Sequence, residues 1–452
     1  MRTMGNVVIV THWLDGDVIP FVRIGKVLRD RGHKVTLLTH CHFEKMAKEA
    51  GLDFEPWDTP EEYKQLVEEM NGGIVLGINN EDFKKKHESF EVRMKEYDKI
   101  LKYCKEENTV ILCKNRSSIA AHMVAEKYEL PLASVMMNPT EVVSMISFDR
   151  LYGKKDIPLC NKLREEIGLP PIKSWLQWES SPSMTLAFWP SWYAKPEQNW
   201  PRPIETIGFP IEEGKEAIKR EIPEDFKIWL KEHEKPLLIS GGTTKLIDPL
   251  FYPMSIAAAE LLNKPTIVLS RYKELLPEEL PANVRWYSYL PLDEIMPYLG
   301  GLIHHGGMGT LSGALRGGVP QLILPCFVDR PYNAALIKEL GVGNYLYRPK
   351  WKPETIAKAV KELMVPEIKE RCLIYAGKMK QNNGVSIAAD KVESLMKEPQ
   401  YIYRFNHDYN GYDYELGEKE EEERSKKNKI FKDLTKEQKM KLLFHIRNRG
   451  GC

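Results

Sequence analysis

The sequence predicts an α/β fold of two doubly wound lobes that face one another across a cleft, with a C-terminal extension. Three observations predict it. Short apolar runs rich in β-branched residues alternate with helical patterns over the first 140 residues, the same rhythm restarts near residue 235, and a stretch rich in proline and tryptophan lies between. With 452 residues and 42% hydrophobic content, the chain is long enough for two cores.

The first lobe is expected over residues 1–205. We expect strands at 6–12 (NVVIVTH), 34–40, 108–115 and 131–137, and helices at 18–32, 43–51 and 117–129. Residues 57–102 are polar and helix-prone, and we interpret them as an insertion rather than core. Because parallel strands need helical crossovers, this order predicts a parallel sheet covered by helices.

A connection over residues 206–234 leads to the second lobe at 235–398. Its expected strands are 235–242, 265–270, 283–291, 300–307 and 321–327, and its expected helices are 248–264, 310–318, 331–341 and 352–364. In such sheets ligands bind beyond the carboxyl ends of the strands, so the cleft is the expected ligand site.

The tail, 399–452, contains a charge run at 417–429 that we interpret as a solvated linker. A short helix is predicted at 433–449, where Thr435 and Gln438 have the spacing of a capping box. This helix either makes a weak membrane or protein contact, or docks on its own protein, or frays.

Charge and cysteine content limit the class of protein. A net charge of +1 gives no reason to expect nucleic acid as a partner. Seven scattered cysteines without a Cys-x-x-Cys pair favour reduced thiols over disulfides or zinc. With no signal peptide and no run of membrane-spanning length, we expect a cytoplasmic protein without a transmembrane segment.

A glycine-rich turn follows the strand at 300–307. His305, Gly307, Gly309 and Thr310 would lie at the start of a helix, where backbone amides and the helix dipole attract anions. A diphosphate fits this turn. A dinucleotide fingerprint ending at Asp329, or glycines and histidines that serve only packing, are alternatives.

The stretch HHGGMGTLSGALRGGVPQLILPCFVDRPYNAALIKELGVG (304–343) resembles the donor-binding segment of glycosyltransferase family 1, above all its bacterial and sterol-glucosylating branches. The resemblance covers most of residues 6–395, but neither 61–102 nor the tail. It implies the GT-B fold, whose two lobes are Rossmann-like. It also implies a nucleotide-sugar donor, UDP- or dTDP-linked, on the C-terminal lobe, a small-molecule acceptor on the N-terminal lobe, and no metal or other cofactor.

The resemblance also implies roles for individual residues. Asp17 occupies the position of the family's catalytic His or Asp and would be the general base, with Asp15 and His12 near enough to assist or substitute. His305 would stabilise the leaving diphosphate. The other expected donor-binding residues are Ser240, Gly241, Gly242, Thr243, Tyr289 for base stacking, Gly307, Gly309, Thr310, Asp329 for sugar hydroxyls, and Arg330.

Two positions depart from the family pattern. Arg330 stands where relatives commonly have glutamine, which suggests a donor sugar with an acidic group or an arginine turned to solvent. Gly313 replaces the ribose-binding glutamate of the plant branch, so the choice between uridine and thymidine stays open.

The predicted function is therefore an inverting, metal-independent glycosyltransferase acting on a hydroxyl of a small-molecule or lipid-like natural product. A nucleotide-sugar epimerase or hydrolase on the same fold, or a non-catalytic auxiliary protein, are the alternatives. The acceptor inference uses four tryptophans that either line an acceptor site or belong to the core: Trp57, Trp175, Trp178 and Trp192.

Overall fold

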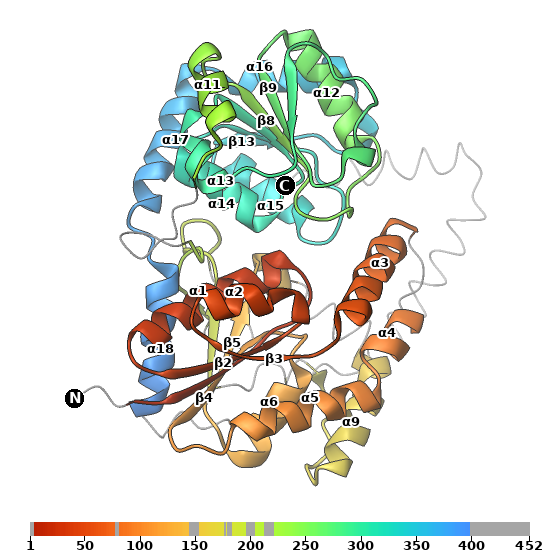
Figure 1. Cartoon of the computed structure of the whole chain (residues 1–452), viewed down its shortest axis with the longest axis vertical. Helices are drawn as coiled ribbons and strands as arrows, with labels where there is room; N and C mark the ends of the chain where they lie inside the picture. Colours follow the sequence, from red (N-terminus) through yellow and green to blue (C-terminus); the bar gives the residue numbers. More distant parts are fainter. Residues whose placement is uncertain are drawn as a thin grey trace, which may run out of the picture.

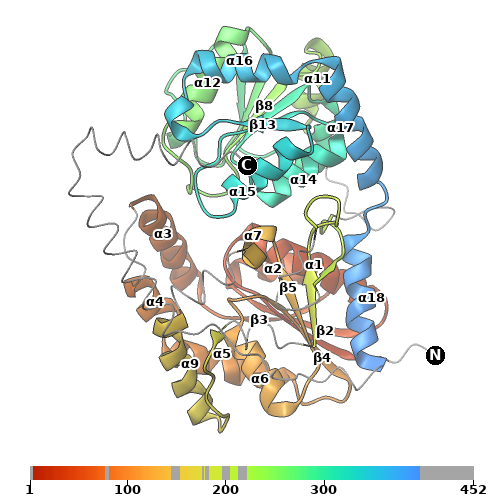
Figure 2. The same cartoon turned by 180° about the vertical axis from the view of Figure 1, so that it is seen from behind.

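The computed structural model describes residues 4–76, 81–143, 153–175, 178, 183–195, 204–211 and 221–397. The predicted tail helix and charge run lie outside these residues. The described chain forms two α/β lobes, one above the other in Figures 1 and 2. The predicted fold class is confirmed.

The N-terminal lobe is built on a seven-stranded parallel sheet of order β3-β2-β1-β4-β5-β6-β7. Its strands are β1 (Asn6–Val10), β2 (Lys34–Thr39), β3 (Asp53–Pro56), β4 (Thr109–Lys114), β5 (Leu132–Met136), β6 (Met184–Ala187) and β7 (Glu205–Thr206). The sequence analysis missed β3, β6 and β7, which are short and lie toward the two edges.

Helices cover both faces of this sheet. They are α1 (Asp15–Asp30), α2 (Glu44–Glu49), α3 (Pro60–Leu76), α4 (Glu81–His87), α5 (Phe90–Tyr103), α6 (Ile119–Tyr128), α7 (Pro139–Val143) and α9 (Lys154–Glu166), with a 3-10 turn, η1 (Cys41–Phe43). Helix α1 buries Val18, Phe21 and Leu28, at successive spacings of three and seven residues, so one apolar stripe faces the sheet.

The interpretation of residues 57–102 as an insertion is only partly correct. Helix α3 projects from the lower lobe toward the upper one in both views (Figures 1 and 2). Helix α5, in contrast, buries Arg93, Glu96, Tyr97 and Ile100 and packs beside α6. The sequence does not show that α5 belongs to the core, because its buried face contains charged residues. Arg93 and Glu96 are paired with each other inside the protein.

The C-terminal lobe has a six-stranded parallel sheet of order β10-β9-β8-β11-β12-β13. Its strands are β8 (Leu237–Ser240), β9 (Thr266–Leu269), β10 (Val284–Tyr287), β11 (Gly301–His304), β12 (Gln321–Ile323) and β13 (Gly343–Tyr345). Strands β8 and β11 pair with Ser240 opposite His304. The loops that follow these two strands are therefore neighbours at the cleft end of the sheet.

The helices of this lobe are α11 (Glu224–Glu232), α12 (Phe251–Leu262), α13 (Leu292–Ile295), α14 (Met308–Gly317), α15 (Arg330–Glu339), α16 (Pro353–Leu363) and α17 (Pro366–Met379), with 3-10 turns η4 (Lys273–Leu275), η5 (Met296–Tyr298) and η6 (Arg348–Lys350). All four helices predicted here are present. Strand β13 and helix α17 were not predicted.

The last described helix, α18 (Gly384–Lys397), returns to the N-terminal lobe. Its Val385, Ala388 and Val392 belong to the same apolar core as β1 and α1, and Arg31 of the N-terminal lobe donates to Asp390 at 2.7 Å. Figure 1 shows α17 and α18 running along the side of both lobes. This crossover ties the two lobes together.

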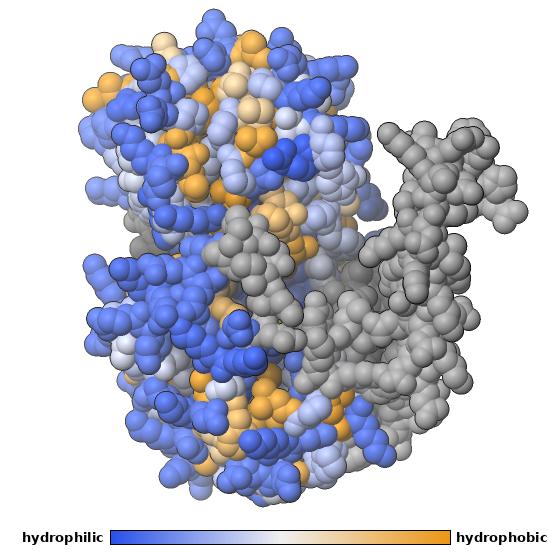
Figure 3. All heavy atoms as spheres, turned by 90° about the vertical axis from the view of Figure 1, so that its right-hand side faces the viewer, coloured by the Kyte–Doolittle hydropathy of each residue, from blue (hydrophilic) through white to orange (hydrophobic). Residues whose placement is uncertain are grey.

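Hydrophilic side chains cover most of the described surface on the face drawn in Figure 3. In the described part of the chain, none of the helices combines the length and apolar character needed to cross a bilayer.

Candidate functional site

The turn between β11 and α14 is shaped by His304. Its Nδ1 accepts a hydrogen bond from the Gly306 amide at 3.2 Å, and its Nε2 donates to Gln321 Oε1 at 3.1 Å. Burial lowers the pKa of His304 to about 3, so the ring stays neutral. His304 is thus a structural residue that fixes the turn for the residues that follow.

The ring of His305 lies between two glycines. A Cβ atom added to Gly307 would lie 2.5 Å from His305 Nε2, and one added to Gly242 would lie 2.9 Å from the same atom. Gly242 also has a φ of +92°, which L side chains rarely adopt. These glycines are required by the close approach of two loops to one imidazole.

His305 is neutral at physiological pH. Burial first, and then the charge of Arg330, lower its pKa well below the usual value. Its Nδ1 is buried and has no hydrogen-bond partner among the described residues. A neutral imidazole still carries one N–H, so His305 can donate to an oxyanion but supplies no net charge.

Helix α14 begins directly after this ring. Gly307 is its extended N-cap residue, and Met308, Gly309 and Thr310 form its first turn. The first amides of a helix have no intrahelical acceptor, and the helix dipole makes this end positive. The structure therefore brings His305, Gly307, Gly309 and Thr310 together in a turn with the groups needed to bind an anion, called the anion-binding turn below.

Asp329 is held by Asn333 at the start of α15. Asn333 Nδ2 donates to Asp329 Oδ2 at 2.7 Å and lies 3.0 Å from the Gly306 carbonyl oxygen. Tyr193 of the N-terminal half donates to Asn333 Oδ1 at 3.3 Å. Burial, and more weakly the charge of Asp17, raise the pKa of Asp329. Asn333 thus holds Asp329 beside the anion-binding turn.

The backbone before Asp329 is strained. Val328 has a φ of +56° although it is β-branched, and its side chain is exposed. Such a conformation costs about 1–3 kcal/mol and is found mostly at functional sites.

Arg330 is not turned to solvent. Its Nη1 donates to the Leu246 carbonyl oxygen at 2.8 Å, and burial lowers its pKa. The guanidinium therefore lies beside the His305 turn and holds the loop that follows β8.

The loop after β8 brings Ser240 and Gly242 to the same place but leaves Thr243 exposed. Ser240 is buried and accepts from the Gly242 amide at 3.4 Å, and the Gly241 amide donates to the Tyr252 hydroxyl at 3.0 Å. Tyr289 follows the edge strand β10 and is 48% exposed. It has an accessible ring, as a stacking residue needs.

Asp17 lies in the first turn of α1, beyond the carboxyl end of β1. Its carboxylate Oδ1 is 2.8 Å from Lys114 Nζ, and its side chain is 28% exposed. Thr11 donates to the Asp17 carbonyl oxygen at 3.0 Å, which fixes the start of the helix. Asp17 is thus an ion-paired, accessible carboxylate on the cleft side of the N-terminal lobe.

The sequence analysis missed Lys114 and Glu141 near Asp17. Lys114 ends β4, and because Val10 of β1 pairs with Cys113, Lys114 lies next to the end of β1. The sequence signal that could have identified Lys114 is a single cationic residue at the end of an apolar strand. Glu141 lies on α7, and nothing in the sequence connects it with Asp17.

Asp15 and His12 lie near Asp17 but have other partners. Asp15 Oδ2 is 3.1 Å from Arg271 Nη1 of the other lobe. His12 is buried, with Nε2 3.0 Å from Glu96 Oε1 and its ring stacked on Trp57 at 5.2 Å. Burial lowers the pKa of His12.

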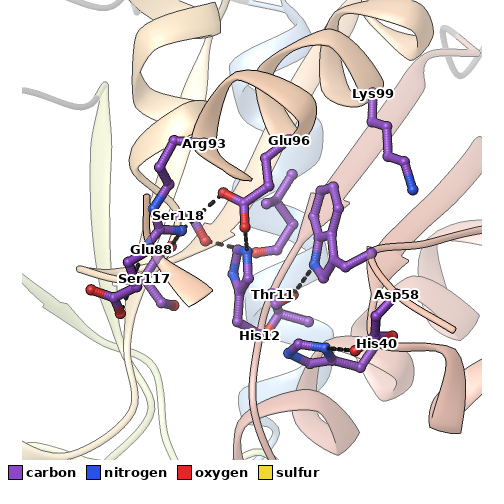
Figure 4. Close-up of polar contacts among 12 residues, drawn as sticks. Thr11, His12, His40, Asp58, Glu88, Arg93, Glu96, Lys99, Ser117 and Ser118 are labelled. Atoms are coloured by element: carbon purple, nitrogen blue, oxygen red, sulfur yellow. Dashed lines mark hydrogen bonds and ion pairs between the residues drawn. The ribbon is translucent and has the colours of Figure 1, made fainter. Parts of the chain in front are cut away.

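Figure 4 shows the network around His12, in which Arg93 donates to Glu96 at 2.9 Å and to the Ser117 carbonyl oxygen at 3.1 Å. His40 makes a separate pair with Asp58 at 2.6 Å. The Glu96 and Arg93 contacts join α5 to the segments that follow β1 and β4, and the His40–Asp58 pair joins the segments that follow β2 and β3. A structural role accounts for His12 without catalysis.

The four tryptophans do not form one acceptor wall. Trp175 and Trp178 are buried together in the core beneath the first sheet, with their rings 5.5 Å apart. Trp192 packs on Phe209 and Tyr375 in the core shared by the two lobes. Trp57 supports His12. Of the two roles that the sequence leaves open, acceptor site or core, the structure shows the core for Trp175, Trp178 and Trp192, whose large apolar rings fill it.

Comparison with known proteins shows what the chain is similar to. Residues 15–145 match the glycosyltransferase family 28 N-terminal domain, and residues 260–379 match the C-terminal domain of erythromycin biosynthesis protein CIII-like proteins. The solved glycotransferase of kitacinnamycin superposes with a TM-score of 0.67 over 87% of this chain and 99% of its own, at 18% identity. Glycosyltransferase VinC, solved in complex with dTDP, gives 0.63 over 86% and 99%, at 16% identity. These likenesses establish the GT-B fold.

More particular relatives are sterol 3-beta-glucosyltransferases. That of Pichia angusta is 24% identical over 85% of this chain and 33% of its own length, and UGT80B1 of Arabidopsis thaliana is 25% identical over 83% and 65%. The chain thus spans about a third of the fungal relative and just under two thirds of the plant one. The matches confirm the resemblance to glycosyltransferases and the GT-B fold.

Proposed function

We propose that this protein transfers a sugar from a nucleoside-diphosphate donor to a hydroxyl group of a small-molecule acceptor. The observation that carries the proposal is the position of Asp17: an accessible carboxylate on one lobe, two residues after Asp15, whose Oδ2 is 3.1 Å from Arg271 Nη1 of the lobe that holds the anion-binding turn. A base and a diphosphate site on facing lobes are what direct sugar transfer needs.

In this mechanism the diphosphate binds at the start of α14. The amides of the first turn, the Thr310 hydroxyl and the His305 N–H would stabilise the charge that develops on the leaving diphosphate. This donor set can act without a metal ion, so we propose metal-independent transfer. Asp329, oriented by Asn333, would accept hydrogen bonds from sugar hydroxyls.

Asp17 would remove the acceptor's proton while the acceptor oxygen attacks the anomeric carbon. Asp17 and the anion-binding turn belong to opposite lobes. An attack from the side opposite the diphosphate inverts the anomeric centre, so we propose an inverting reaction.

The acceptor class rests on the relatives. The sequence relatives are named for sterols, and one of the solved structures is named for kitacinnamycin. We propose a hydrophobic small-molecule alcohol, such as a sterol, as the acceptor. Whether the donor nucleotide carries uridine or thymidine stays open. The assignment to a bacterial branch stays a prediction.

Release of nucleoside diphosphate from a panel of UDP- and dTDP-sugars, with and without sterol and macrolide alcohols, tests the function. Acceptor-dependent release that persists in EDTA, with a product of inverted anomeric configuration, is the expected result. Release without acceptor would favour a hydrolase or epimerase, and tight donor binding without release would favour an auxiliary protein.

A further inference from the structure

Lys114 is the residue that fixes the side chain of Asp17. Lys114 Nζ lies 2.8 Å from Asp17 Oδ1, and only 13% of the Lys114 side chain is exposed. An ammonium group at this distance orients the carboxylate, but it also stabilises the anion and so weakens it as a base. A base paired in this way needs a compensating negative charge nearby.

Glu141 supplies a carboxyl group near Lys114, because Lys114 pairs with Val135 of β5 and the Glu141 carboxylate binds the chain just after that strand. Its Oε1 accepts hydrogen bonds from the Met137 amide at 3.2 Å and from Asn138 Nδ2 at 3.0 Å. Its Oε2 is buried and has no hydrogen-bond partner among the described residues. One oxygen is therefore anchored, and the other is free to respond to the charges around it.

Three charged groups act on Glu141 from neighbouring elements. They are Lys114 at the end of β4, Arg116 in the following turn and Asp17 on α1. Arg116 also donates to the Glu141 carbonyl oxygen at 2.9 Å, from a backbone with a φ of +62°. This strained turn holds α7 against the end of β4.

We propose that Lys114 is a positioning residue for Asp17, and that the carboxylate of Glu141 offsets the charge of Lys114 so that Asp17 remains basic enough to accept the acceptor's proton. This inference rests on the proposed function. It assigns Lys114 and Glu141 indirect roles, since neither needs to touch the reacting atoms.

The proton balance of the step is simple. The acceptor O–H bond breaks and its proton moves to an Asp17 oxygen, while the acceptor oxygen bonds to the anomeric carbon. The bond from that carbon to the diphosphate breaks, and its electron pair leaves with the diphosphate. Lys114 then loses its anionic partner at Asp17 but keeps the one at Glu141, which stabilises the protonated state of Asp17.

Burial raises the pKa of Glu141 to about 7, opposed by Lys114 and Arg116 and reinforced by Asp17. Glu141 therefore gains its charge as the pH rises through neutrality. If the carboxylate is the active form, kcat rises over the same range.

The experiment is the pH dependence of kcat from about pH 5 to about pH 9 in wild type, Glu141→Gln, Lys114→Met and Lys114→Arg. We expect the rise of kcat near neutrality to disappear in Glu141→Gln, leaving it about tenfold below wild type at high pH. We expect Lys114→Met to lower kcat about 10- to 100-fold with little change in the KM for donor, and Lys114→Arg to recover most of it.

Lys26→Met and Glu106→Gln are the matched controls, because each removes one partner of a surface ion pair away from the cluster. The inference would be overturned if kcat of Glu141→Gln still rose near neutral pH, or if Lys114→Met had the kcat of wild type. A wild type that transfers no sugar would defeat the proposed function instead. Thermal unfolding then still tests the electrostatic coupling of Glu141 to its charged neighbours. The Tm of Glu141→Gln should exceed that of wild type at about pH 8 but not at about pH 5. The same difference in Tm at both pH values would refute this coupling.

Discussion

Asn333 Nδ2 donates to Asp329 Oδ2 at 2.7 Å and also lies 3.0 Å from the carbonyl oxygen of Gly306 in the anion-binding turn. One amide thus aligns the proposed sugar-binding acid with the proposed diphosphate site. Because Tyr193 contacts the other side of this amide, the alignment also depends on how the lobes meet.

Replacing Asn333 by Leu should separate sugar recognition from nucleotide binding. Asp329 loses its anchor while the anion-binding turn remains, so we expect the kcat/KM for the sugar donor to fall about tenfold or more. The affinity for the free nucleoside diphosphate, measured by calorimetry, should change little. An equal loss for both ligands would mean that Asn333 only stabilises the fold.

Gly307→Ala should damage the site through His305. The new Cβ would lie 2.5 Å from His305 Nε2, so the ring or the start of α14 must move. We expect donor binding to weaken at least tenfold, as for a displaced site residue. Gly377→Ala is the control, since a Cβ there meets nothing within 4 Å. Equal behaviour of the two variants would argue against the close packing described above.

Glu141→Gln should change how stability depends on pH. The folded-state pKa of Glu141 is raised above its unfolded value, from 4.5 to about 7. In wild type the resulting stability is therefore present below about pH 4.5 and lost as the pH rises to about 7. Relative to wild type, the free energy of unfolding of Glu141→Gln should increase across this window by up to about 3 kcal/mol. Denaturant unfolding at several pH values measures it, and a constant difference would contradict it.

Arg330→Gln tests the donor-sugar hypothesis. Arg330 holds the Leu246 carbonyl oxygen beside the His305 turn, so its removal should weaken donor binding. If the guanidinium also binds an acidic sugar, the variant should lose activity with a glucuronic acid donor more than with a glucose donor. A wild type that prefers glucose, together with an unchanged Arg330→Gln, would reject an acidic donor sugar.

Most of the fold could be predicted from the sequence because the central strands are apolar runs rich in β-branched residues. The elements that were missed are short edge strands such as β13, whose few residues carry little pattern, and α5, whose core face contains Arg93 and Glu96. Their burial depends on partners from distant segments, and no local pattern contains that information.

The candidate site was predicted in part. The residues of the anion-binding turn lie together because they are contiguous at one strand–helix junction, which the sequence displays directly. Lys114 and Glu141 join Asp17 only through strand order, since β4 lies next to β1 in the sheet. The sequence left the roles of Trp175 and Trp178 open, because an aromatic residue has the same appearance in a core and in a pocket.

The most direct test of the central claim compares wild type with Asp17→Asn in single-turnover sugar transfer, with donor affinity measured on the same samples. Asparagine keeps the shape of the side chain but cannot accept the proton. We predict a transfer rate about 10²- to 10⁴-fold lower with unchanged donor affinity. A variant that transfers sugar at the wild-type rate would contradict the assignment of Asp17 as the base.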